Sequence, residues 1–224
     1  LYGFGENCSL RALSREPLGL AGSRVRVAFD GGEAVDYEVP LPGEAGTLAA
    51  LAALAAVRAL LDVAAPPAAL REALQVVGRV RDGRFAVETL ADGTVLLDDT
   101  YNSNTGSARS SLKTARELAD ALDRRLVVVL GEMREMGPLA AEEHEEVARA
   151  AVAARPAALV AVNGEAERFA VAAAGAGIAA SFFPSGEEAV PHVLDLVRAG
   201  DVVLVKASRG VRLETVASAL RSAR

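Results

Sequence analysis

The sequence LVVVL at residues 126–130 is a continuous apolar run near the middle of the chain. A strand without a polar residue on either face is typical of a parallel sheet that is covered on both sides. A second run of this kind, VVLV at 202–205, lies close to the end of the chain. Segments with helical spacing of apolar residues flank both runs. The two runs therefore predict a buried parallel sheet between layers of helices.

Strands and helices alternate around these two runs from residue 84 onward. The pattern predicts strands at 85–90, 95–97, 126–130, 159–162, 178–183 and 202–205, with helices at 107–122, 140–154, 165–174, 187–197 and 212–221. Such alternation implies right-handed βαβ units. We therefore predict an α/β fold, with a doubly wound, mostly parallel, Rossmann-like sheet over residues 81–224.

Residues 1–80 have a different organisation. Alternating residues at 24–29 and 35–41, with a turn at 30–33 between them, predict a β-hairpin. Two helices are then expected, at about 47–61 and from the Pro66-Pro67 pair to about residue 77. A polar stretch at 78–83 separates this part from the sheet domain. Residues 1–80 are thus expected to form a smaller unit of their own.

Composition restricts the classes of partner. The 224 residues carry a formal net charge of −6 without any basic run, which argues against a nucleic-acid partner. Cys8 is the only cysteine, and the N-terminal residues have no signal-peptide pattern. The longest apolar run, Leu48 to Val57, is too short to span a bilayer. We expect a cytoplasmic protein with no membrane partner.

Polar residues follow four of the predicted strands. In an open parallel sheet, ligands bind beyond the carboxyl ends of the strands. Loops are polar in any protein, and Ser107 and Ser185 are expected to be helix N-caps. Polar and glycine residues after four strands nevertheless predict a binding site at that edge of the sheet. The segments concerned are 98–104, 131–135, 163–164 and 206–209.

Several of these segments resemble motifs of the Mur ligase family. LDDTYNSNTGS at 97–107 is similar to the DDSYNANP-type motif of the branch that adds D-alanyl-D-alanine, and GEMREMG at 131–137 is similar to its GDM-x-ELG loop. KASR at 206–209 resembles KGSR, and Gly83-Arg84 stands at the spacing of the family's Gly-Arg pair. His144 either matches a family histidine or is an ordinary helix-surface residue. The motifs occur in the family's order over roughly residues 83–215.

The resemblance implies a role for individual residues. Arg84 would contact ATP phosphate, unless it forms an interdomain salt bridge, and Asp99 would hold the nucleotide ribose. Asp98 is expected to be a structural neighbour. No catalytic residue and no metal ligand is predicted. The remaining expected site residues are Asn104, in a loop facing the nucleotide, Tyr101 and Asn102, facing substrate, and Lys206, Ser208 and Arg209, facing the incoming dipeptide.

The resemblance also implies a reaction. ATP would phosphorylate the terminal carboxylate of UDP-MurNAc-tripeptide, and the amine of D-Ala-D-Ala would attack the acyl phosphate, with Mg²⁺ offsetting the charge. Residues 1–80 would be part of the central, ATPase-type domain. The sequence contains no G-x-x-x-x-G-K-[ST] segment. We therefore expect the P-loop, the Mg²⁺ ligands and the UDP-sugar domain upstream of Leu1, and no ligase activity from this chain alone.

Three departures from the family pattern leave alternatives open. PGEAGTLA at 42–49 stands where the family has Pro-Gly-x-His-Asn-x-x-Asn, so the residues that serve the adenine side of the ATP site are replaced. Thr105 replaces a proline and Ala207 a glycine. One alternative is a Mur-type ligase that adds another amino acid or a folate-type glutamate, although the 131–137 loop together with residues 99–102 argues against it. The other is a non-catalytic binding module.

Overall fold

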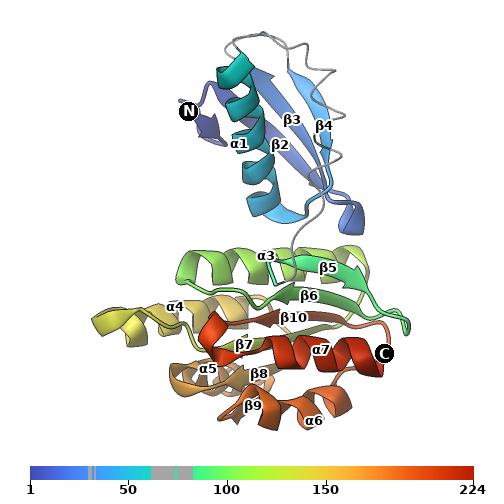
Figure 1. The fold of residues 1–224 in the computed structure, drawn as a ribbon, viewed down its shortest axis with the longest axis vertical. Helices are drawn as coiled ribbons and strands as arrows, with labels where there is room; N and C mark the ends of the chain where they lie inside the picture. Colours follow the sequence, from blue (N-terminus) through green and yellow to red (C-terminus); the bar gives the residue numbers. More distant parts are fainter. Residues whose placement is uncertain (30–31, 33, 62–73, 75–82) are drawn as a thin grey trace. The chain divides into compact units, whose positions relative to one another are not determined.

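The computed structural model describes residues 1–29, 32, 34–61, 74 and 83–224 (Figure 1). The chain divides into two compact units, Leu1–Arg79 and Val80–Arg224. Most of the predicted turn at 30–33, the predicted helix at 66–77 apart from Leu74, and the predicted boundary at 78–82 lie outside the described residues.

The first unit is a four-stranded sheet with one described long helix. Its strands are β1 (Tyr2–Gly3), β2 (Leu10–Pro17), β3 (Ser23–Phe29) and β4 (Val35–Val39), in the order β1-β2-β3-β4. Strands β3 and β4 pair antiparallel, so the predicted hairpin is confirmed. Helix α1 (Gly43–Leu61) covers one face of this sheet. The core between sheet and helix is formed by apolar side chains that include Leu10, Val25, Val27, Tyr37, Leu51 and Leu54.

Strand β2 was not expected from the sequence. Its pairing with β3 shifts register between Ala12 and Ser14, which is a β-bulge. The bulge ends the alternation of buried and exposed side chains after Ala12, and the second half of the strand carries polar residues. A strand with such an interruption lacks the period-two signal on which the prediction depends.

Helix α1 begins four residues earlier than predicted. Gly43 has φ of +77°, a backbone conformation that favours glycine, and the Thr47 hydroxyl donates to the Gly43 carbonyl at 3.3 Å. The exposed side of the helix carries Ala45, Leu48 and Ala49. By length and composition alone, the window Gly43–Leu60 would suffice to cross a bilayer, with a mean hydropathy of 1.4 and 28% of it buried. That is weak support for a membrane span, because helices that pack against a protein core pass the same test.

The second unit is built on a six-stranded sheet in the order β5-β6-β10-β7-β8-β9. The strands are β5 (Ala86–Thr89), β6 (Val95–Asp99), β7 (Leu126–Gly131), β8 (Ala158–Val162), β9 (Ala179–Phe183) and β10 (Val202–Lys206). All neighbours pair parallel except β5, which runs antiparallel to β6 at one edge. The predicted doubly wound, mostly parallel sheet is confirmed.

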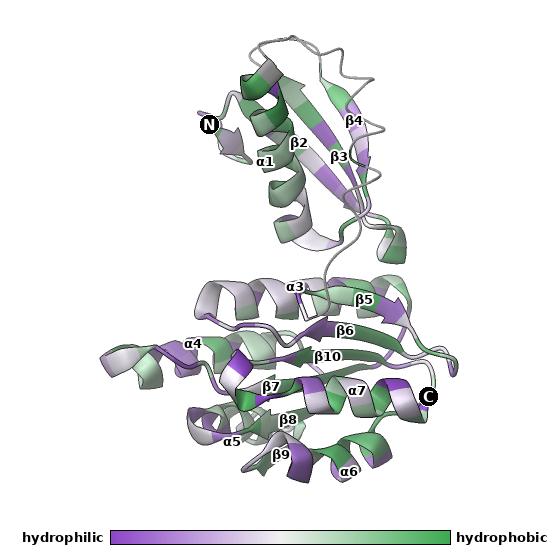
Figure 2. Cartoon of the chain, viewed as in Figure 1, coloured by the Kyte–Doolittle hydropathy of each residue, from purple (hydrophilic) through white to green (hydrophobic). Residues whose placement is uncertain are grey.

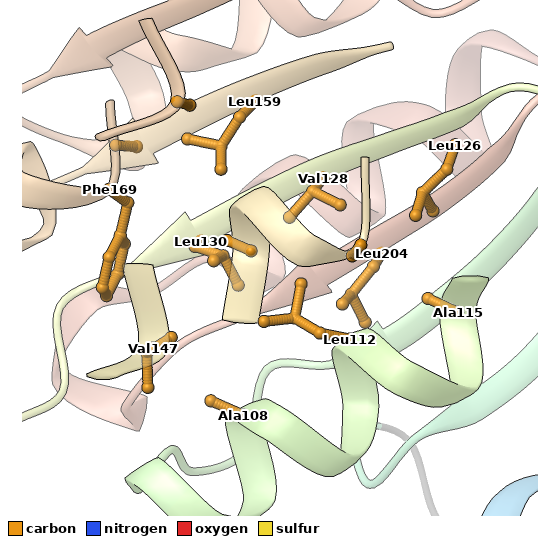
Figure 3. Close-up of a cluster of buried hydrophobic side chains, with 14 of the residues drawn as sticks. Ala108, Leu112, Ala115, Leu126, Val128, Leu130, Val147, Leu159, Phe169 and Leu204 are labelled. Atoms are coloured by element: carbon orange, nitrogen blue, oxygen red, sulfur yellow. The ribbon is translucent and has the colours of Figure 1, made fainter. Parts of the chain in front are cut away.

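Helices cover both faces of this sheet (Figure 1). One face packs against α3 (Thr105–Ala121), α4 (Ala140–Ala153) and α5 (Glu167–Gly175), and the other packs against α6 (Gly186–Leu196) and α7 (Glu214–Ala223). Successive strand residues alternate between the two layers: Val128 faces α3–α5, while Val127 and Val129 face α6 and α7. Figure 3 shows the first of these cores, with Leu112 of α3 beside Leu204 of β10.

This packing explains why the sequence of β7 is a continuous apolar run. Every residue from Leu126 to Leu130 is at most 2% exposed, because helices cover the strand from both sides. In Figure 2 the central strands are coloured as hydrophobic, whereas purple residues lie mainly on the outer helices and at the strand ends. The polar strand ends are therefore the part of the sheet in which a ligand site is expected.

Candidate functional site

The four polar segments expected at the sheet edge lie at the carboxyl ends of β6, β7, β8 and β10, and three of them begin with the last one or two residues of the strand. These strands are adjacent and parallel in the order β6-β10-β7-β8, so their carboxyl ends lie along one edge. Three of the four segments are joined by hydrogen bonds from side chains. They are called here the 98–104 loop, the 131–136 loop and the 206–209 loop.

The two consecutive aspartates at the end of β6 point to opposite faces of the sheet. Asp98 faces α7, where Arg221 Nη2 donates to its Oδ2 at 2.7 Å and Thr100 donates to its Oδ1 from both the backbone amide and the hydroxyl. Its side chain is 3% exposed. Burial lowers the pKa of Arg221, but its bonds to Asp98 and Glu88 outweigh that effect and leave the pKa raised. Asp98 thus joins the last helix to the sheet, in agreement with its predicted structural role.

Asp99 faces α3 and carries a different set of bonds. Lys206 Nζ donates to Asp99 Oδ2 at 2.6 Å, and Ser111 Oγ of α3 donates to the same oxygen at 2.7 Å. Lys206 is 1% exposed. Burial lowers the pKa of Lys206, and the charge of Asp99 offsets part of that effect. Ser111 was not expected from the sequence, because nothing in a helical serine indicates which strand end it contacts.

The 98–104 loop is held by its own side chains. Asn102 Oδ1 accepts from the Ser103 amide at 2.8 Å, and the Asn102 carbonyl accepts from Lys206 at 2.9 Å. Asn104 is the N-cap of α3, and its side chain accepts from the Ser107 amide at 2.8 Å. The expectation that Ser107 caps the helix is wrong, since Ser107 is the third helical residue of a capping box. Ser185 caps α6 as expected, by accepting from the Glu188 amide.

Ser208 connects all three loops. Its hydroxyl donates to the Ser103 carbonyl at 3.3 Å and accepts from the Arg134 amide at 2.9 Å, and its own amide donates to the Glu132 carbonyl at 3.3 Å. A small hydroxyl residue at this position is therefore explained by its contacts within the protein. The side chain is 4% exposed.

His144 on α4 contacts the 131–136 loop through a hydrogen bond. The Met133 amide donates to His144 Nε2 at 2.9 Å, and the Ala140 carbonyl lies 2.6 Å from Nδ1. Since Nε2 accepts, the ring is neutral and Nδ1 carries the proton that it donates to Ala140. The ring stacks on Phe169 and is fully buried. The interpretation of His144 as a helix-surface residue is therefore wrong.

Two arginines stack on one exposed tyrosine at the edge of the site. The Arg84 guanidinium carbon lies 3.8 Å from the centre of the Tyr101 ring, and that of Arg209 lies 5.4 Å from it. The Tyr101 amide also donates to the Gly83 carbonyl at 2.8 Å. Tyr101 is 41% exposed, and both arginine side chains are exposed. Within the described part of the chain neither arginine forms an ion pair, so both remain available to an anion.

The structure shows the surroundings of three of the residues that depart from the expected motifs. A side chain at Gly46 would meet Leu41 Cβ at 2.6 Å, so the close packing of α1 on Leu41 leaves no room there for a larger residue. Ala207 fills the space beside Gly131, where an added Cβ would lie 2.6 Å from the Ala207 Cβ. Thr105, in the first turn of α3, donates to the carboxylate of Glu143 on α4.

A groove of about 550 Å³ lies elsewhere, between α4 and α5. It contains none of the predicted site residues, and the Arg168 guanidinium across it is bonded to Glu145 and Glu165. Among the described residues, no group of three His, Cys, Asp or Glu side chains is arranged to hold a metal ion.

Comparison with known proteins places this domain in a family. Residues 83–209 match the family described as "Mur ligase, glutamate ligase domain". The chain is 34% identical over 183 residues to a UDP-N-acetylmuramoyl-tripeptide--D-alanyl-D-alanine ligase of Mycobacterium leprae, a match that covers 75% of this chain and 35% of the relative. The chain thus spans about a third of the length of that relative.

Solved structures share the fold over nearly the whole chain. MurF from Acinetobacter baumannii is similar with a TM-score of 0.78 and 23% identity, over 99% of this chain and 46% of that one. MurF ligase from Thermotoga maritima, solved in complex with ADP, is similar with a TM-score of 0.74 and 22% identity, over 99% of this chain and 48% of that one.

Proposed function

Because the chain belongs to the Mur ligase family, we propose that it is the downstream part of an ATP-dependent ligase that joins D-alanyl-D-alanine to UDP-MurNAc-tripeptide. One observation carries the proposal: Asp99 and the pair Arg84 and Arg209 occupy the strand-end edge of a domain that matches the family. The relative from Mycobacterium leprae bears the name of this activity. A cytoplasmic location follows from the proposed substrates.

The proposed reaction has two steps. The γ-phosphoryl group of ATP transfers to the terminal carboxylate of the tripeptide, which gives an acyl phosphate and ADP. The amine of D-Ala-D-Ala attacks the acyl carbon, loses a proton and displaces inorganic phosphate, so that an amide bond forms. Mg²⁺ would offset phosphate charge in the first step.

We propose that the exposed residues at this edge of the sheet contact the ligands. Arg84 and Arg209 offer guanidinium donors for phosphate or carboxylate oxygens, and Tyr101 holds both by its ring. Asp99 offers a carboxylate that accepts from ribose hydroxyls. These residues bind the substrates and take no part in making or breaking a bond, so the domain acts by positioning substrates.

Asn102, Asn104 and Ser208 are assigned a different role. The side-chain oxygens of Asn102 and Ser208 are bonded to backbone groups of the loops, and that of Asn104 is bonded to a backbone amide in the first turn of α3. We propose that they set the shape of the 98–104 and 131–136 loops and act on the nucleotide and the substrates only through that shape.

Kinetics of the whole protein test the proposal. The whole protein means the full-length ligase of which we propose that this chain is a part. Arg84→Ala removes a charge-assisted contact of about 1.5–3 kcal/mol, so kcat/KM for ATP should fall by about one to two decades. Asp99→Asn should raise the KM for ATP more than that for D-Ala-D-Ala. Arg149→Ala, on the exposed side of α4, is the matched control and should leave both constants unchanged.

The outcomes separate the competing functions. Normal kcat/KM for ATP in Arg84→Ala would mean that Arg84 does not serve the nucleotide. Amide formation with another amino acid or with a glutamate of a folate, and not with D-Ala-D-Ala, would favour a different Mur-type ligase. No ATP-dependent amide formation with any of these acceptors would favour a binding module. We also propose that the 224-residue chain alone has no ligase activity, which the same assay measures directly.

A further inference from the structure

Lys206 is a buried cation in the centre of the site. Lysine is almost never fully buried unless it is paired, yet Lys206 at the end of β10 is 1% exposed. Its register partner on the neighbouring parallel strand β6 is Asp99, so the two side chains lie on the same face of the sheet. A cation placed in this way is enclosed by protein and has little surface left for a substrate.

The bonds of Lys206 are made to two parts of the 98–104 loop. Nζ lies 2.6 Å from Asp99 Oδ2 and 2.9 Å from the Asn102 carbonyl oxygen. The first bond holds the side chain that begins the loop, and the second holds the backbone three residues later. Lys206 therefore fixes both the carboxylate and the course of the loop that follows it.

The two oxygens of Asp99 are in different situations. Oδ2 accepts from both Lys206 and Ser111, the latter at 2.7 Å. Oδ1 accepts from no group in the described part of the chain, and the Asp99 side chain is 14% exposed. The Ser111 hydroxyl has a single proton and also lies 2.8 Å from the Ser107 carbonyl, so Lys206 is the main donor that fixes the rotation of the carboxylate. Oδ1 is then the remaining acceptor of Asp99.

We propose that Lys206 is a positioning residue for the nucleotide, which holds Asp99 so that Oδ1 accepts from a ribose hydroxyl, and that it does not bind the incoming dipeptide. The proposal rests on the proposed function, in which Asp99 serves the ribose. It differs from the expectation drawn from the KASR motif, which directed Lys206 to the dipeptide. Ser111 has the same role from α3, as the second donor to Oδ2.

A double-mutant cycle in the whole protein tests this inference. Lys206→Met removes the donor at similar side-chain length, and Asp99→Asn removes the charge that it holds. Each change should raise the KM for ATP about tenfold, and the double variant should match the single ones, because contacting residues in one network are not additive. The KM for D-Ala-D-Ala should stay within about twofold. A rise in that KM, or independent addition of the two effects, would overturn the proposal.

If Lys206→Met does not fold, Ser111→Ala provides a separate test of how Asp99 is held. It removes only one of the two donors and should raise the KM for ATP about threefold. Ser110→Ala, one residue earlier on α3, is the matched control and should leave that KM unchanged. Equal effects of the two alanine variants would count against the proposal.

A second measurement does not depend on ligase activity. Thermal melts of the 224-residue chain with Lys206→Met, Asp99→Asn and both changes measure the coupling of the pair directly. We expect the melting shifts of the two single variants to be non-additive by several degrees. Strongly non-additive Tm shifts, combined with a lack of ligase activity in the whole protein, would reject the proposed function but support the contact between Lys206 and Asp99. Additive Tm shifts would reject the positioning role of Lys206.

Discussion

Substitution of Asp98 distinguishes an effect on stability from an effect on ligand binding, because Asp98 neighbours Asp99 in sequence but faces the other side of the sheet. We predict that Asp98→Ala destabilises the second unit strongly. The change removes the carboxylate at 2.7 Å from Arg221 Nη2 and the acceptor of two bonds from Thr100, at 3.2 Å and 2.7 Å. The Asp98 side chain is 3% exposed, so water does not replace these bonds.

The expected loss follows from the kinds of bond. A hydrogen bond between charged groups contributes about 1.5–3 kcal/mol, and each neutral bond about 0.5–1.5 kcal/mol. Arg221 keeps its bond to Glu88, which limits the damage. Breaking a buried pair costs about 3–5 kcal/mol. For a domain of this size, about 4 kcal/mol corresponds to a fall in Tm of about 8–16 °C.

Two milder variants define the control series. Asp98→Asn keeps an oxygen for Thr100 but loses the charge and the acceptor for Arg221, so about half of the effect should remain. Glu88→Gln changes the exposed partner of Arg221, whose side chain is 37% exposed, and should cost about 0–1 kcal/mol. Calorimetry gives the Tm values, and kinetics of the whole protein should show an unchanged KM for ATP. A Tm of Asp98→Ala within about 2 °C of the parent would refute this account of the strand end.

Three further predictions concern other parts of the chain. Amides of the first unit should exchange faster than those of the second, because the outer face of α1 is apolar and exposed; equal protection in hydrogen-exchange measurements would contradict this. Arg224→Ala should lower the Tm at neutral pH by removing the bond at 2.7 Å to Asp92 and two bonds to helix carbonyls. Burial raises the pKa of Asp92, but its bonds to Arg224 and Thr94 outweigh that effect and leave the pKa lowered. The Asp92 part of the Tm difference is therefore present above the unfolded-state pKa and is lost as the pH falls through the folded-state pKa. The two carbonyl bonds do not titrate, so a Tm difference as large at pH 2 as at neutral pH would refute the Asp92 contribution. His144→Leu should destabilise by about 1–3 kcal/mol, because the buried Met133 amide loses its acceptor, and chemical denaturation without a shifted midpoint would exclude that role.

The sequence by itself determined the architecture of the second unit. Continuous apolar runs such as 126–130 and 202–205 are required of strands covered on both faces, and that requirement depends only on local pattern. The strand ends and their polar segments follow from the same pattern, which is why the polar segments were predicted to gather along one edge of the sheet. The first unit was predicted less completely, because the bulge after Ala12 removes the alternation that identifies a strand.

Only the tertiary structure decided what each polar residue at that edge contacts. Lys206 and Asp99 are 107 positions apart in sequence and meet because β10 and β6 pair in register. Asp98 finds Arg221 on α7, and His144 finds the Met133 amide, through contacts that leave no local signal. A residue's type and spacing determine which bonds it is able to make, whereas its partner depends on which elements the fold packs beside it, and that is a property of the whole chain.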